Sequence, residues 1–280
     1  MKKLNKKQFI IIIAGLLIAI TAASLFIWIG KERDKKFIKV SGNIEGDDVR
    51  MSFRVNGQIT ELLVDEGFVV KKDETVARLN TDELSKIRDN AEAALKAAEY
   101  EHSLAQVDYE RAENLLAAGS ITTQKRDAAK TKADATKSEV EKLRASLKLA
   151  ETRLGFTELK SPLAGYILVK SALAGEVVQP GAPVFTVIDL NNIWVTAYIN
   201  ETDLARVKLN QKADVVTDTY PGKKYNGWVS FISSQSEFTP KQIQTTEERV
   251  KLVYRIKVRV DNSSLELKPG MPADAFILLE

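Results

Sequence analysis

At 280 residues the chain is long enough for one large domain or two small ones, and its 41 basic and 38 acidic residues leave a formal net charge of +3. The basic residues are spread along the chain, which argues against the clustered patch of a nucleic-acid-binding protein. The absence of cysteine excludes disulfides, thiolate metal sites and an acylated cysteine anchor.

The first predicted element is a membrane-spanning helix from Phe9 to Gly30. The segment carries no charge, and a helix of this length would measure about 33 Å, enough to cross a bilayer. It follows four basic residues, Lys2, Lys3, Lys6 and Lys7. This bias predicts that the N-terminus lies in the cytoplasm and everything from Lys31 onward lies outside. The alternative is a cleaved signal peptide, but its apolar region is usually only about 7 to 15 residues, so we favour a retained anchor.

Two later segments share one pattern. GQITELLVDEGFVVKKDETVARL, from Gly57, aligns without gaps with GYILVKSALAGEVVQPGAPVFTV, from Gly165, and the alignment superposes Gly67 on Gly175. Apolar residues at near-alternating positions predict strands, and the glycines mark turns or close backbone approaches. Each segment therefore predicts a pair of short strands with a tight turn, and two copies in register are stronger evidence for this than one.

The sequence between these halves predicts an antiparallel coiled-coil hairpin. Its first apolar seam runs through Leu84, Ile87, Ala91, Leu95, Ala98, His102, Ala105, Tyr109, Ala112 and Leu116, with one doubled four-residue step that begins at Ile87. The second runs through Ala129, Ala133, Thr136, Val140, Leu143, Leu147, Ala150 and Leu154. Gly119 suits the left-handed position that ends the first helix, and Thr122 or Thr123 can cap the second.

The C-terminal third predicts a small antiparallel β-barrel. About five strand patterns follow one another, with turns at Pro221-Gly222, Asn226-Gly227 and Pro269-Gly270. The strand FIKVSGNIE near the anchor is expected to join them. Trp194 and Trp228 lie in these strand patterns, where barrel packing is their expected role.

The two β halves resemble the halves of a biotinyl/lipoyl-type barrel, with LKSPLAG leading into the second. In carrier proteins of that fold the cofactor lysine lies on a hairpin between the halves, and here the helical segment occupies that place. A carrier function therefore lacks its reactive group and remains the less favoured alternative. No catalytic motif is present, and His102, the single histidine, is better explained as a seam residue than as a metal ligand.

The segment RAENLLAAGSITTQKRD resembles the hairpin tip of HlyD-like periplasmic adaptors, also called membrane-fusion proteins. That resemblance implies that Arg111, Leu115 and Thr122 contact an outer-membrane channel, with threonine in the place of the family's serine. Structural roles remain open for all three: a solvated arginine, a leucine that covers the turn and a helix cap. SEFTPKQIQTTEERVKLVYRIKVRV followed by KPGMPADAFI resembles the branch that is paired with ABC-type exporters.

The sequence thus predicts a mixed α+β, elongated and modular protein. The expected parts are a cytoplasmic tip and anchor (1–30), a linker and first barrel strand (31–50), a split lipoyl-like domain (51–80 plus 159–190), the hairpin (81–158) and a β-barrel with a reduced membrane-proximal part (191–280). The resemblance implies a non-enzymatic adaptor without cofactor or metal that is held in the inner membrane. It also implies a homo-oligomer, specifically a hexamer, whose partners are an ABC-type transporter and a TolC-like channel. A membrane-tethered coiled-coil interaction protein without a transport role is the other alternative.

Overall fold

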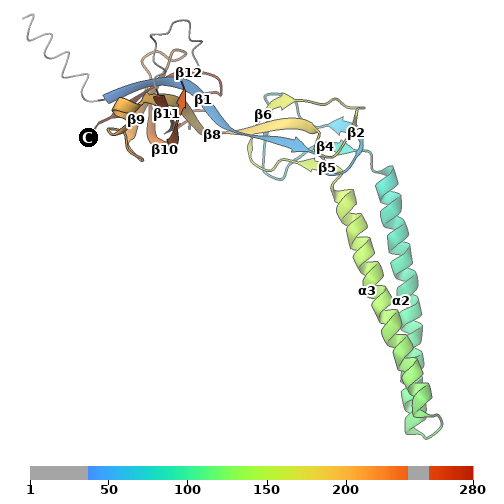
Figure 1. Cartoon of the computed structure of the whole chain (residues 1–280). Helices are drawn as coiled ribbons and strands as arrows, with labels where there is room; N and C mark the ends of the chain where they lie inside the picture. The colour runs from blue at the N-terminus through green and yellow to red at the C-terminus, as the bar shows by residue number, and fades with distance from the viewer. Residues whose placement is uncertain (1–36, 239–251, 280) are drawn as a thin grey trace, which may run out of the picture. The chain divides into compact units, whose positions relative to one another are not determined.

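The computed structural model describes residues 37–238 and 252–279. Within these ranges no helix combines the length and apolarity needed to cross a bilayer, and the predicted anchor at 9–30 lies outside them. The described residues divide into two compact units, which are residues 48–188 and, together, residues 37–47, 189–238 and 252–279. The two long helices follow one another in the chain, and the strands lie before and after them (Figure 1). The predicted mixed α+β modular architecture is therefore confirmed.

One unit is an antiparallel β-barrel. Its strands follow the order β1, β12, β9, β10, β11 and β8, and β1 also pairs with β8. The bounds are β1 Phe37–Ser52, β8 Pro183–Asn200, β9 Lys212–Thr217, β10 Tyr225–Phe238, β11 Leu252–Val260 and β12 Pro272–Leu278, with the short helix α4 at Glu201–Leu204. Inward residues alternate with outward ones, as in Ile193, Val195 and Ala197 of β8, which are fully buried in the core.

The second unit contains the split β module. Its strands are β2 Gly57–Leu62, β3 Val69–Val70, β4 Thr75–Leu79, β5 Glu158–Lys160, β6 Gly165–Lys170 and β7 Val177–Val178. β7 of the second half pairs with β2 of the first, and β3 of the first pairs with β6 of the second. Strands of each half therefore pair with strands of the other, and both halves enclose one core. Neither half can bury its apolar face alone.

Backbone geometry supports the repeat seen in the sequence. Gly67 and Gly175, which the alignment superposes, have φ angles of 82° and 92°, and the aligned Asp73 and Gly181 have φ angles of 63° and 85°. This left-handed region favours glycine, and aspartate adopts it more readily than most residues. The same two turns thus occur at the same places in each half.

Two long helices join the halves. α2 (Asp82–Ala117) and α3 (Thr123–Gly155) lie side by side and are connected by a short loop at the end remote from the β strands (Figure 1). At 1.5 Å per residue, the 36 residues of α2 extend about 54 Å. The helices pack along the predicted seams, where His102 Nδ1 lies 3.1 Å from Thr136 Oγ1. Supercoiling of the pair stays a prediction.

The seam of α2 differs from the prediction at its doubled step. Ile87 is 44% exposed, whereas Arg88, one residue later, is half-buried. With Arg88 in the seam, the spacing from Leu84 to Ala98 alternates four and three throughout. Placing Ile87 in the seam was wrong. The prediction chose the isoleucine because it is apolar, but the aliphatic part of a long arginine side chain can also pack in a seam.

A buried tyrosine in the barrel gives a prediction about alkaline stability. Tyr225 is 4% exposed and donates a hydrogen bond of 2.7 Å to Glu266 Oε2. Burial, followed by the bond to Glu266, raises the pKa of Tyr225 from its ordinary value of 10.0 to about 12. The tyrosine ionises more easily in the unfolded chain, so the stability linked to its protonated form is intact below about pH 10 and is lost as the pH rises toward about 12.

We therefore expect the midpoint of denaturant unfolding, followed by tryptophan fluorescence, to be lower at about pH 11 than at about pH 9. Tyr225→Phe removes the ionisable group and should show a smaller fall over the same interval. An equal fall in both proteins would mean that other groups cause the alkaline sensitivity.

Candidate partner-binding site at the hairpin tip

The loop between the two helices is fixed by its own backbone. Gly119 has a φ of 72°, and its N–H donates to the carbonyl of Leu116 at 2.8 Å, while the N–H of Ser120 donates to the carbonyl of Leu115 at 2.8 Å. These bonds satisfy carbonyls that the end of α2 would otherwise leave free. The predicted left-handed glycine is confirmed, and backbone hydrogen bonds close the loop.

Thr122 caps the helix that follows. It has extended backbone angles, and its Oγ1 accepts a hydrogen bond from the N–H of Lys125 at 3.4 Å. The predicted cap is thus confirmed at Thr122. The side chain is also exposed, and an accepting hydroxyl still has its proton to donate. Capping therefore does not exclude a bond from Thr122 to a partner.

Arg111 and Leu115 occupy one side of the last turns of α2, because residues four apart on a helix are neighbours. Arg111 donates to Asp108 Oδ1 at 3.1 Å, and the two side chains are 69% and 53% exposed. A pair this exposed contributes little to stability, so the guanidinium stays available for a carboxylate or carbonyl partner. Leu115 is 47% exposed. The three residues thus present a cation, an apolar side chain and a hydroxyl near the loop.

A polar cluster behind the tip joins the two helices and was not predicted. Tyr109 donates to Glu113 Oε1 at 2.8 Å, and Arg126 of α3 approaches the same Glu113 oxygen at 4.0 Å. The bond to Glu113 raises the pKa of Tyr109. Tyr109 was identified only as a seam position, and its link to α3 depends on the register of the two helices, which the sequence does not encode locally.

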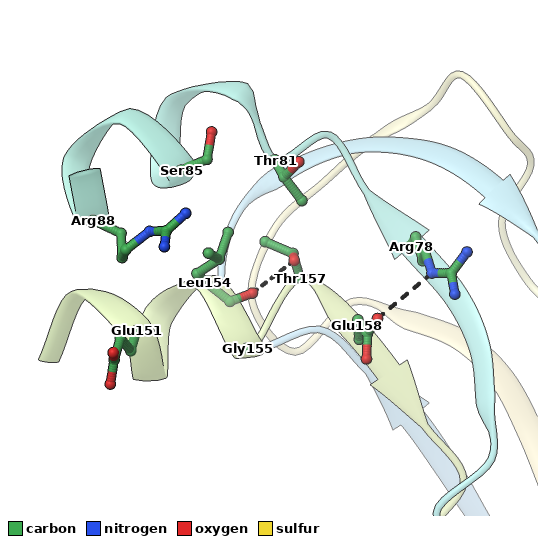
Figure 2. Close-up of a pocket in the computed structure, with 9 residues that line it drawn as sticks. All are labelled: Arg78, Thr81, Ser85, Arg88, Glu151, Leu154, Gly155, Thr157 and Glu158. Carbon is green, nitrogen blue, oxygen red and sulfur yellow. Dashed lines mark hydrogen bonds and ion pairs between the residues drawn. The ribbon is translucent and has the colours of Figure 1, made fainter. Parts of the chain in front are cut away.

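The base of the hairpin is joined to the β module beside an open hollow of about 440 Å³ (Figure 2). The hollow is lined by Arg78, Thr81, Ser85, Arg88, Glu151, Leu154, Gly155, Thr157 and Glu158. The Thr157 hydroxyl donates to the carbonyl of Leu154 at 2.7 Å, and Arg78 of β4 pairs with Glu158 of β5 at 3.6 Å. These contacts tie the end of α3 and the flanking strands together, so the module positions the hairpin.

Two other predicted roles can be compared with the structure. In the described residues, no cluster of three or more histidine and acidic side chains suits a metal ion. Trp194 is 9% exposed, but Trp228 is 41% exposed on the outer face of β10. The interpretation of Trp228 as barrel packing is therefore wrong, because strand alternation was assigned without knowing which face the core would cover.

Family models match both units. Residues 48–189 match the model of the CzcB-like barrel-sandwich hybrid domain, and residues 193–277 match the YknX-like β-barrel domain. A UPF0194 membrane protein of Acidithiobacillus ferridurans is 39% identical over 191 residues, which cover 68% of this chain and 53% of that protein. The chain thus spans about half the length of that relative. A UPF0194 membrane protein of Yersinia pseudotuberculosis is 26% identical, over 96% of this chain and 98% of the relative.

Solved structures share the fold. MacA from Actinobacillus actinomycetemcomitans superposes with a TM-score of 0.72 and 21% identity, covering 88% of this chain and 79% of MacA. A membrane fusion protein from Streptococcus pneumoniae superposes with a TM-score of 0.68 and 17% identity, covering 87% of this chain and 99% of that protein. At these identities the likeness concerns the fold alone.

Proposed function

Because the chain belongs to the family of membrane-fusion proteins, or periplasmic adaptors, we propose that it links a transporter in the inner membrane to a channel in the outer membrane. The observation that carries this proposal is the hairpin tip. Arg111, Leu115 and Thr122 are all exposed at the end of a hairpin about 54 Å long that is rooted in the split β module. Such a tip suits docking against the helices of a second protein.

The proposed arrangement is a homo-oligomer, a hexamer, around an ABC-type transporter. Each chain is held by a single membrane helix at 9–30, with its N-terminus in the cytoplasm and the rest outside. The work of the protein is positioning and sealing, so we propose that it is not an enzyme. Support comes from the exposed, charged surface of the hairpin and from the family, whose solved relatives include MacA.

A biotin or lipoyl carrier is disfavoured by the connection between the two halves. That connection consists of α2 and α3, so the short turn that would present a carrier lysine is replaced by a long helical hairpin. A covalent cofactor on any lysine, detected as added mass in the intact protein, would contradict the proposal. A tethered interaction protein without a transport role would leave export unchanged when its gene is deleted.

Photo-cross-linking at the tip tests the docking directly. A photo-reactive amino acid at Thr122, in intact cells, is expected to capture an outer-membrane channel protein identified by mass. The matched control is the same amino acid at Lys137, which is also exposed and lies partway along α3. Capture from Lys137 but not from Thr122, or capture from neither, would argue against docking through the tip.

A further inference from the structure

The barrel unit exposes a group of large apolar side chains. Among the side chains described in this unit, those with exposed fractions between 37% and 58% are Tyr198, Leu209, Trp228, Phe231, Leu252 and Leu278. We call this group without Trp228 the Phe37-end surface, for the position derived below. Scattered single exposures are ordinary, but a group of five gathered on one part of a small domain indicates a binding surface.

Strand directions locate the group. Each neighbouring pair in the series β1, β12, β9, β10, β11, β8 is antiparallel, so β8 runs opposite to β1. The end of the barrel where β1 begins at Phe37 is therefore also the end where β8 and β12 finish and where β11 starts. Leu278 lies directly opposite Phe37, Leu252 is the first residue of β11, and Tyr198 is two residues from the end of β8.

Two of the remaining three residues adjoin this end. Leu209 precedes Asn210, whose N–H donates to the carbonyl of Val229 at 2.8 Å, two residues before Phe231. The side chain of Gln211 donates to the carbonyl of Leu278 at 2.7 Å, which brings the same loop beside β12. Trp228 is near the start of β10 and lies opposite Arg259, near the end of β11, so it lies farther from Phe37. The other five side chains thus share one region.

Basic residues on β11 accompany the apolar ones. Ile256, Val258 and Val260 face the core, so the alternating Arg255, Lys257 and Arg259 face outward. Their cross-strand neighbours are largely aromatic: Arg255 is opposite Tyr198, Lys257 is opposite Phe231, and Arg259 is opposite both Trp194 and Trp228. The ammonium of Lys257 lies 3.9 Å from the ring centre of Trp194. Cations and aromatic rings therefore alternate across the sheet.

The charge on this face is not neutralised within the described structure. Arg255 pairs with Glu237 at 3.2 Å, whereas no ion pair within 4.0 Å joins Lys212, Lys257 or Arg259 to another described residue. The amide of Asn192 accepts from Arg259 and leaves its charge in place. A partner that is both apolar and negatively charged would complement this surface.

The chain itself limits where the surface can be. Phe37 follows Gly30, the end of the uncharged run at 9–30, by seven residues, and seven residues span at most about 25 Å in any conformation. If that run crosses a bilayer, the end of the barrel where β1 begins is held close to the lipid headgroups. Leucine, tryptophan and tyrosine partition into that layer, and lysine and arginine extend toward lipid phosphates.

We infer that the Phe37-end surface rests on a bilayer that contains anionic phospholipid, with the apolar side chains among the headgroups and Lys212 and Lys257 on the phosphates. This inference rests on the proposed membrane attachment and extends it, because the barrel itself becomes a second, charge-dependent membrane contact. Such a contact fixes the orientation of the barrel on the membrane, which a single tethered strand cannot do.

The absence of cysteine permits a clean test with the full chain. Leu209→Cys is labelled with an environment-sensitive fluorophore, and the protein is placed in nanodiscs of phosphatidylcholine alone or mixed with phosphatidylglycerol, with brominated acyl chains as quenchers. The matched control is Thr219→Cys, an exposed position in the loop from β9 to β10 at the opposite end of the barrel. Quenching at position 209 is expected to exceed that at 219 about threefold or more in the anionic discs.

The combined change of Lys212 and Lys257 to glutamine should cut the quenching at 209 by at least about half in anionic discs and change little in neutral ones. Equal quenching at 209 and 219 in anionic discs would overturn the inference. So would a label at 209 that is shielded from a water-soluble quencher but not quenched by lipid, because a second copy or another protein would then cover it. A chain that fails to stay in the discs at all would instead show that the proposed attachment itself is wrong.

Discussion

Leu115→Glu is expected to reduce the resistance of cells to exported toxic compounds to the level of a strain that lacks the gene. Leu115 is 47% exposed, so its replacement stays in water in the free protein and should change the helical content and the stability little. In the docked state, the new carboxylate would lose its water against an apolar surface without a compensating partner, which is strongly unfavourable. Inhibitory concentrations for the compounds to which the deletion strain is sensitive measure the effect.

Two matched variants separate docking from a general effect of charge on the hairpin. Leu104 in α2 and Leu149 in α3 are 60% and 54% exposed, but both lie away from the tip. Leu104→Glu and Leu149→Glu should leave resistance unchanged. Thr122→Ser should do the same, because serine keeps both the hydroxyl and the cap. If Leu104→Glu is as harmful as Leu115→Glu, the tip is not the contact site.

The parts of the fold that could be predicted from sequence are those fixed by local residue patterns. The left-handed turns of the repeat depend on Gly67 and Gly175, and the hairpin loop depends on Gly119 and Thr122. Glycine favours the left-handed region and threonine favours the N-cap position, so the residue types alone predict these features. The spacing of the apolar residues predicted the seams except at Arg88. After Leu84 the seven-residue periodicity allowed either Ile87 or Arg88 as the next seam residue, and apolarity selected Ile87, which was wrong.

The features that could not be predicted depend on which segments meet. The Tyr109–Glu113–Arg126 cluster needs the register of α2 against α3. The exposure of Trp228 depends on which face of β10 covers the core, and a shift of one residue in register would reverse it. At the tip, the residues were identified through a resemblance. The structure adds that Arg111 and Leu115 are exposed and that the Thr122 hydroxyl has a structural role as well.

Gly165→Ala is expected to destabilise the β module by about 3 kcal/mol or more. A Cβ at this position would lie 2.2 Å from the carbonyl oxygen of Ile188 and 2.9 Å from Leu163 Cδ1. The first of these atoms belongs to the backbone of the paired strand β8, so a rotamer change cannot relieve the overlap and β6 must separate from β8. Native-state hydrogen exchange should show amide protection in β6 and β2 reduced by about two orders of magnitude.

Two other glycines serve as controls for Gly165→Ala. Gly57 is its partner in the repeat, but there a Cβ would meet only the flexible side chain of Leu79, at 3.1 Å, so Gly57→Ala should cost clearly less. Gly155, the last residue of α3, has no atom within 4 Å of the added carbon, and alanine favours the helix by up to about 1 kcal/mol. Gly155→Ala should therefore leave protection unchanged or raise it. Similar losses in all three variants would mean that glycine flexibility, and not close strand approach at Gly165, explains why a glycine stands at these positions.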